Sequence, residues 1–242
     1  MQKKIIILLS IGFIMISISC IFFARVFMEK IFYEYLIEKN YKIEEIMFDP
    51  SIDQLQEPNT IFFHENKIKV THTNQQPDKI TGLNGNLYSY ADISLQINNK
   101  SIDVLKQYGI RINEQAFNQY YGNVAFFKIF NLKTKEERFA VVLNKSKDKI
   151  TRDLTGLLPV KERKFRIIYI STGGNVNIED FSYKNRNKLQ TLLAQSITPR
   201  SFGYYTNFFV EYYSIYTLPI YTFTLLIGII VLYKQFRKIK IK

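Results

Sequence analysis

Two uncharged runs, one near each end of the chain, decide the fold: IIILLSIGFIMISISCIFF at residues 5–23 and YYSIYTLPIYTFTLLIGIIVLY at residues 212–233. A hydrocarbon core of about 30 Å is crossed by about 20 helical residues, so both runs are long enough to span a membrane. We therefore predict transmembrane helices over residues 5–24 and 212–233. The chain between them, residues 25–211, is predicted to form one folded domain.

Basic residues flank both runs and predict their orientation. The first run is preceded by Lys3 and Lys4, and the second is followed by Lys234, Arg237, Lys238, Lys240 and Lys242. Because Lys and Arg concentrate on the cytoplasmic side of membrane proteins, residues 1–4 are predicted to be a cytoplasmic stub and residues 234–242 a basic cytoplasmic tail. Two spans place both ends on one side. The expected location is the cell membrane, with two crossings and an extracytoplasmic central domain.

The first run also has two alternative interpretations. Ser17 and Ser19 have the spacing of a signal-peptide cleavage site before Cys20, which could itself carry a lipid. Apolar residues continue through Phe23, beyond that cleavage point. This continuation favours a retained helix, and the cleaved and lipid-modified forms stay open as alternatives.

Composition narrows the classes of function. The chain has 242 residues, one Cys and two His, which excludes an internal disulfide framework and a four-cysteine zinc site. The net charge of +12 suggests a nucleic-acid partner, but seven of the 33 basic residues lie in the predicted cytoplasmic ends. The rest of the chain carries 26 basic against 21 acidic residues, a net +5. We do not expect nucleic acid as a partner. The expected partners are the lipid bilayer and another membrane protein or an envelope polymer.

The middle of the chain alternates short apolar runs with polar clusters, which predicts a mixed α+β domain. Helices are predicted over 27–46, from an N-cap at Ser101 to Gly109, over 114–121 and over 179–195. Strands are predicted at 60–63, 67–71, 87–90, 92–97, 124–130, 138–143 and 164–170. The pattern does not predict the order of these strands in a sheet.

Aromatic residues recur at spacings of one and three just before the second apolar run. These candidate membrane-interface residues are Tyr204, Tyr205, Phe208, Phe209, Tyr212, Tyr213 and Tyr216. Tyr and Phe are typical of the membrane–water boundary, where the rings are buried and the phenols stay hydrated. The alternative is a juxtamembrane helix that docks a membrane partner.

Sequence motifs for catalysis are absent: the chain has no phosphate-binding loop, dinucleotide-binding, zinc-protease or nucleophile-elbow pattern. His64 and His72 lie on the two arms of the predicted hairpin, several cross-strand pairs out of step, which argues against a shared metal. Glu136–Glu137 is interpreted as the polar end of a hairpin, and Glu179–Asp180 as acids in the first turn of a helix. We therefore predict no catalytic, cofactor-binding or metal-binding residues.

One basic cluster is a candidate for anionic surfaces. Lys184, Arg186 and Lys188 are interleaved with Tyr183, which would suit lipid headgroups or wall polymers outside the cytoplasm. A solvated helix face is the alternative interpretation.

The functional expectation therefore rests on the predicted membrane topology. We expect a two-pass membrane protein whose extracytoplasmic domain binds an envelope component, a peptide or a partner membrane protein, in a sensor, accessory or assembly role. An extracytoplasmic hydrolase acting on envelope material and a scaffold subunit of a membrane complex are the alternatives. The sequence leans against an enzyme and resembles no family closely enough to name one.

Overall fold

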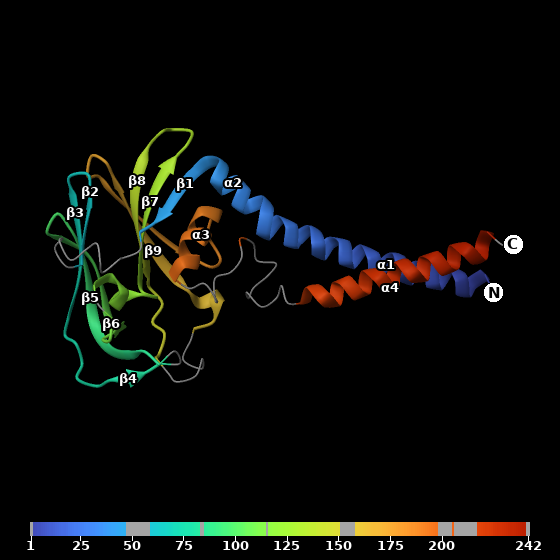
Figure 1. Cartoon of the computed structure of the whole chain (residues 1–242), viewed down its shortest axis with the longest axis horizontal. Coiled ribbons are helices and arrows are strands. Elements are labelled where there is room, and N and C mark those ends of the chain that lie inside the picture. The colour runs from blue at the N-terminus through green and yellow to red at the C-terminus, as the bar shows by residue number, and fades with distance from the viewer. Residues whose placement is uncertain are drawn as a thin grey trace. The chain divides into compact units, whose positions relative to one another are not determined.

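The computed structural model describes residues 2–46, 59–82, 85–114, 116–150, 158–197, 205 and 217–240. The chain divides into two compact units (Figure 1). The helical unit comprises Met1–Leu36 together with Tyr204–Lys242, and the β domain comprises Ile37–Gly203.

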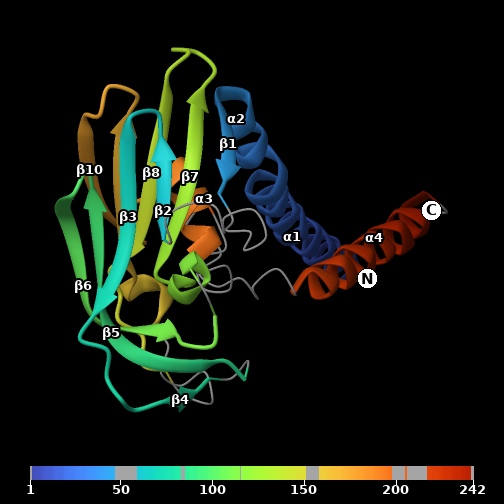
Figure 2. The ribbon, with the colours of Figure 1, turned by 60° about the vertical axis from the view of Figure 1, so that its left-hand side comes forward.

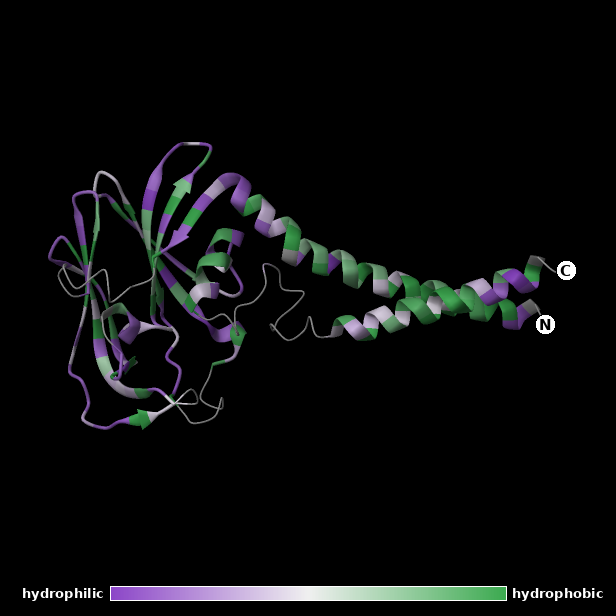
Figure 3. Cartoon of the chain, in the orientation of Figure 1, coloured by the Kyte–Doolittle hydropathy of each residue, from purple (hydrophilic) through white to green (hydrophobic). Residues whose placement is uncertain are grey.

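The helical unit is a pair of long helices, α1 (Gln2–Phe27) and α4 (Leu218–Lys240), which pack antiparallel. The ring of Phe22 stacks on that of Tyr221 with 3.8 Å between centroids, and Gly12 lies against Gly228 nearer the chain ends. Both helices are long and apolar enough to cross a membrane, and Figure 3 shows apolar residues along most of their length. Two further helical pieces follow α1: a π-helical turn, η1 (Met28–Phe32), and α2 (Tyr33–Asn40).

The β domain contains two antiparallel sheets. Sheet A has the order β1-β7-β8-β9-β10. Its strands are β1 (Tyr41–Glu45), β7 (Val124–Asn131), β8 (Glu137–Asn144), β9 (Lys164–Ser171) and β10 (Val176–Ser182). Four successive residues of β8, Ala140 to Leu143, are fully buried, because both faces of this sheet are covered.

Sheet B is built around the long strand β5, which has β3 on one side and β6 on the other. Strand β2 extends the sheet beyond β3, and the short β4 pairs with the start of β5. Its strands are β2 (Thr60–Phe63), β3 (Asn66–Thr73), β4 (Ile80–Thr81), β5 (Leu87–Ile97) and β6 (Lys100–Arg111).

The two sheets face each other and enclose the larger of two hydrophobic cores (Figure 2). Sheet B contributes Val70 and Ile93, and sheet A contributes Phe139, Val141 and Ile168, all 2% exposed or less. Burial of such side chains contributes about 1.5–3 kcal/mol each, so this core dominates the stability of the domain.

A second core lies on the opposite face of sheet A, where helix α3 (Lys188–Ile197) covers the strands. Leu193 and Ala194 of α3 pack against Val142 of β8 and Ile167 of β9, and all four are fully buried. Two short 3-10 turns, Ala116–Tyr120 and Val160–Glu162, complete the described elements of the domain.

Most predicted strands are confirmed, including the 60–71 hairpin, the 124–143 hairpin and the strand at 164–170. Two helix predictions are wrong. Residues 100–111 form β6, and the first part of the 179–195 helix belongs to β10, so that α3 begins only at Lys188. The helix predicted over 27–46 ends at Asn40, and the 114–121 helix is a single 3-10 turn.

These corrections make the central domain β-rich, with two antiparallel sheets, rather than a balanced α+β mixture. The physical reason is that a strand ladder with one buried face outweighs weak local helix signals. Strand β6 bonds along β5 for most of its length, and buries Leu105 and Ile110 in the core between the sheets. That ladder outweighs the local cap signal at Ser101.

Candidate functional site

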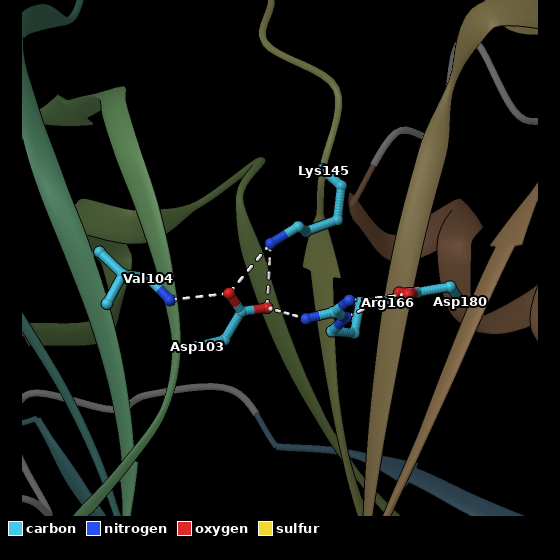
Figure 4. Close-up of polar contacts among 5 residues, drawn as sticks. All are labelled: Asp103, Val104, Lys145, Arg166 and Asp180. Carbon is cyan, nitrogen blue, oxygen red and sulfur yellow. Dashed lines mark hydrogen bonds and ion pairs between the residues drawn. The ribbon is translucent and has the colours of Figure 1, made fainter.

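A cluster of charged side chains joins the two sheets along one edge of the sandwich (Figure 4). Asp103 of β6, with 8% of its side chain exposed, accepts hydrogen bonds from Lys145 Nζ at 3.0 Å to each carboxylate oxygen. Arg166 of β9 donates to the same carboxylate at 3.1 Å, and the backbone N–H of Val104 donates at 2.7 Å. A single acid of sheet B is thus bound by Arg166 of sheet A and by Lys145, which directly follows β8.

Arg166 lies between two carboxylates. Its Nε and a terminal nitrogen each donate at 2.7 Å to the oxygens of Asp180 in β10. These bonds favour the charged forms of both partners, so they lower the pKa of Asp180 and raise that of Arg166. A general acid or base needs a pKa near the working pH, and this pair is shifted the other way. The cluster therefore acts as a clamp between sheets.

A second ion pair is more deeply buried. Arg163, only 1% exposed, donates to the two oxygens of Asp148 at 3.0 and 3.3 Å. Asp148 also accepts the backbone N–H of Leu158 at 2.7 Å. These contacts join Asp148, which follows β8, to Leu158 and Arg163, which precede β9, and this is again a structural use of charge.

The two histidines serve different parts of the sandwich. His64, in the turn between β2 and β3, places Nε2 2.9 Å from Glu137 at the start of β8. His72 of β3 contacts the Tyr120 hydroxyl through Nδ1 at 3.0 Å, and burial raises the pKa of Tyr120 to about 12. Within the described ranges, no group of three or more His, Cys, Asp or Glu is placed to hold a metal ion.

A polar network stabilises an irregularity in sheet B. The pairing of β5 with β6 shifts register next to Asp92, opposite which Gln107 adopts a left-handed backbone with φ of 57°. Asp92 accepts the Gln107 backbone N–H and the Asn74 amide, each at 2.8 Å. The hydrogen bond from Asn74, and next in size that from Gln107, lower the pKa of Asp92. The ionised carboxylate thus accepts the hydrogen bonds that hold the bulge in place.

The predicted basic patch lies between β10 and the first turn of α3. The guanidinium of Arg186 stacks over the ring of Tyr183 at 3.8 Å and donates to the Tyr183 carbonyl. Lys184 and Lys188 are exposed on either side. The role of these three residues at an anionic surface stays a prediction.

Of the predicted membrane-interface residues, Tyr205 alone lies within the described residues. Tyr204, Phe208, Phe209, Tyr212, Tyr213 and Tyr216 lie outside them. Tyr205 is 7% exposed, and its ring lies 5.9 Å from that of Tyr33. Its backbone N–H donates to Glu29 Oε2 at 2.7 Å.

The predicted orientation charges lie at the ends of the two long helices. Lys3 and Lys4 are exposed in the first turn of α1, and Lys234, Arg237 and Lys238 are exposed near the end of α4. Lys240 is the last residue of α4, and Lys242 lies outside the described residues.

Two contacts were missed by sequence reasoning. Asp103 lies within the helix predicted from Ser101 to Gly109, and Glu29 lies just beyond the first predicted transmembrane helix, where no local pattern distinguishes it. The partners of Asp103 lie 42 and 63 residues away along the chain, and the partner of Glu29 lies 176 residues away. No local pattern in a single sequence signals pairs at such separations.

These elements define a class of protein: a β-sandwich domain inserted in the chain between two long apolar helices that pack antiparallel. No family model, curated protein or solved structure matches the chain.

Proposed function

We propose that this chain is a two-pass membrane protein of the cell membrane, with both termini in the cytoplasm and the β domain on the extracytoplasmic side. In this proposal the β domain binds an envelope component, a peptide or a partner membrane protein, in a sensor, accessory or assembly role.

The observation that carries the proposal is the arrangement of charge on the helical unit. Because α1 and α4 pack antiparallel, with Gly12 against Leu232 and Phe22 against Tyr221, the first turn of α1 lies beside the end of α4. Figure 1 shows the two chain ends together. The basic residues that precede one apolar stretch therefore gather with those that follow the other, as the positive-inside rule requires of two spans with both termini in the cytoplasm.

The use of charge in the β domain favours binding over hydrolysis. Among the described residues of this domain, Asp103 and Arg163 are buried charged side chains, and each is held in ion pairs with residues distant in the chain. A hydrolase needs a poised acid or base with access to substrate, and these groups are occupied by each other.

The topology is tested by cysteine labelling in intact cells. Cys20 is the single cysteine of the chain, so Cys20→Ser gives a background into which Lys133→Cys or Lys238→Cys is introduced. We expect a membrane-impermeant maleimide to label Lys133→Cys in intact cells, and Lys238→Cys only after permeabilisation. Labelling of Lys238→Cys from outside would overturn the proposal.

The binding role is tested by crosslinking and capture from solubilised membranes. Replacing α1 and α4 by unrelated spans should leave the captured partner unchanged if the β domain carries recognition. Loss of that partner on span replacement, with the β domain folded and outside, would instead favour the scaffold alternative, in which the helices carry specificity.

A further inference from the structure

Glu29 is an acidic side chain in an unusual position. It lies in the π-helical turn η1, which follows the apolar helix α1 and precedes the more polar α2. Its side chain is only 1% exposed. Burying a carboxylate costs several kcal/mol unless hydrogen bonds compensate for the lost water. The position is therefore tolerated only because the side chain is bound within the fold.

Glu29 accepts a hydrogen bond from Tyr205, a residue of the helical unit that follows the β domain in the chain. The backbone N–H of Tyr205 donates to its Oε2 at 2.7 Å, although 176 residues separate the two. Tyr205 makes a second contact with the same region. Its ring centroid lies 5.9 Å from that of Tyr33, which is one helical turn beyond Glu29. Tyr205 itself is 7% exposed.

These contacts join the two segments that connect the β domain to the long helices. One segment leaves α1 through η1, and the other leads from residue 205 toward α4. While Glu29 holds Tyr205, the end of α1 and the residue at which the chain returns to the helical unit stay together. Any movement of one segment relative to the other has to break this contact.

We propose that Glu29 and the η1 turn form a conformational latch that fastens the returning chain at Tyr205 to the end of α1 and opens without unfolding of either unit. On opening, the carboxylate exchanges the Tyr205 N–H for water, which offsets part of the cost of losing that hydrogen bond. A π-turn is a widened helical turn, a feature frequently found at functional sites, and it presents Glu29 at the point where the latch forms. As a route for signals between the β domain and the membrane, the latch rests on the function proposed above.

The test is amide hydrogen exchange on the full chain in lipid nanodiscs, with ¹⁵N-tyrosine and ¹⁵N-valine labelling to observe Tyr205 and Val141. We expect the Tyr205 amide to be protected at least tenfold in the wild-type chain and in Glu29→Gln, whose amide oxygen can still accept the bond. In Glu29→Leu, which keeps the volume but removes the acceptor, protection should fall at least tenfold. Glu34→Leu, at an exposed position one turn further on, is the matched control and should change nothing.

Protection at Val141, buried in β8, reports whether the change is local. A latch predicts that Val141 protection exceeds that of Tyr205 and is the same in Glu29→Leu as in the wild type. An unprotected Tyr205 amide in the wild-type chain, no loss in Glu29→Leu, or equal losses at Val141 would each overturn the latch. External labelling of Lys238→Cys would instead overturn the proposed function and leave the exchange result standing.

Discussion

At the scale of single residues, the β domain uses charge and glycine to set the distance between its sheets. Asp103 reaches from sheet B to Arg166 of sheet A and to Lys145, which directly follows β8. Asn66 of β3 lies against the turn between β9 and β10. Removing the charge of Asp103, or adding a side-chain atom where Asn66 meets that turn, would therefore affect both sheets. These positions are therefore the sharpest tests of the sandwich.

Asp103→Asn should lower the free energy of unfolding of the β domain by about 2–3 kcal/mol, because charge-assisted hydrogen bonds to Lys145 and Arg166 are weakened while both cations stay partly buried. Asp180→Asn is the control. Its side chain is 62% exposed, so the loss should be about 0.5–1 kcal/mol. Urea unfolding followed by near-UV circular dichroism measures both, and equal losses would contradict the clamp.

The dependence of stability on pH follows from the Arg166–Asp180 pair. The pKa of folded Asp180 lies below its ordinary value of 3.8, so the stability that the pair supplies is present above pH 3.8 and is lost as the pH falls through the folded value. The difference in urea midpoint between wild type and Asp180→Asn should therefore be constant from about pH 7 to 5 and shrink below about pH 4. A difference that grows on acidification would refute this assignment.

Gly174 provides a comparison with its own neighbour. Its φ is +81°, and a Cβ there would lie 2.9 Å from Asn66 Oδ1, whereas a Cβ on Gly173 meets no atom within 4 Å. Gly174→Ala should cost about 1–2 kcal/mol of stability, and Gly173→Ala less than about 0.5 kcal/mol. Thermal unfolding of both variants checks the prediction, which fails if the two are equally stable.

At the scale of elements, close packing of glycines defines the contact between α1 and α4. A Cβ on Gly228 would lie 3.1 Å from the carbonyl oxygen of Gly12 and 2.9 Å from Ile16, so backbone meets backbone here. In a bilayer, where lipid tails are as apolar as the side chains, close packing of this kind favours helix association. The helix pair therefore depends on the absence of a side chain at these two positions.

Gly228→Leu should move α1 and α4 apart by about 2 Å or more, because leucine cannot fit between the backbones. Spin labels at Lys4 and Arg237, both exposed near the chain ends, would show this as a longer and broader distance distribution. Ile227→Phe adds bulk at a position that is 49% exposed and should leave the distance unchanged. An unchanged distribution in Gly228→Leu would rule out this packing.

At the scale of the whole molecule, the proposed orientation depends on where the positive charge lies. The basic residues at the end of α4 and beyond it should keep the tail in the cytoplasm. Replacing all five by Gln should give a mixed population, in which part of the molecules expose the tail to the outside. The five are Lys234, Arg237, Lys238, Lys240 and Lys242.

Labelling of a cysteine placed after the tail measures that population. Lys184→Gln with Lys188→Gln removes charge from the β domain instead and should leave the orientation unchanged. If neutralising the tail has no effect, or if the control variant changes the orientation as strongly, charge at the end of α4 does not set the topology.

Local patterns in the sequence were sufficient for the long helices and for most strands. An uncharged run of about 20 residues forms a helix in any apolar setting, and hairpins such as β7–β8 join neighbours in the chain. The signals involved extend over a few residues, so a single sequence contains them. The predicted orientation charges are equally local, because they adjoin the two apolar runs.

Tertiary structure alone decided the identity of β6 and β10, the contacts of Asp103 and the bond between Glu29 and Tyr205. Helix caps and first-turn acids contribute about 0.5–2 kcal/mol, which a ladder along a neighbouring strand and a buried face readily exceed. In this protein the sequence by itself determined the two apolar helices, the charge that surrounds them and the local hairpins. How the hairpins join into two sheets, and which charges face each other, was decided only by packing between residues tens to hundreds of positions apart.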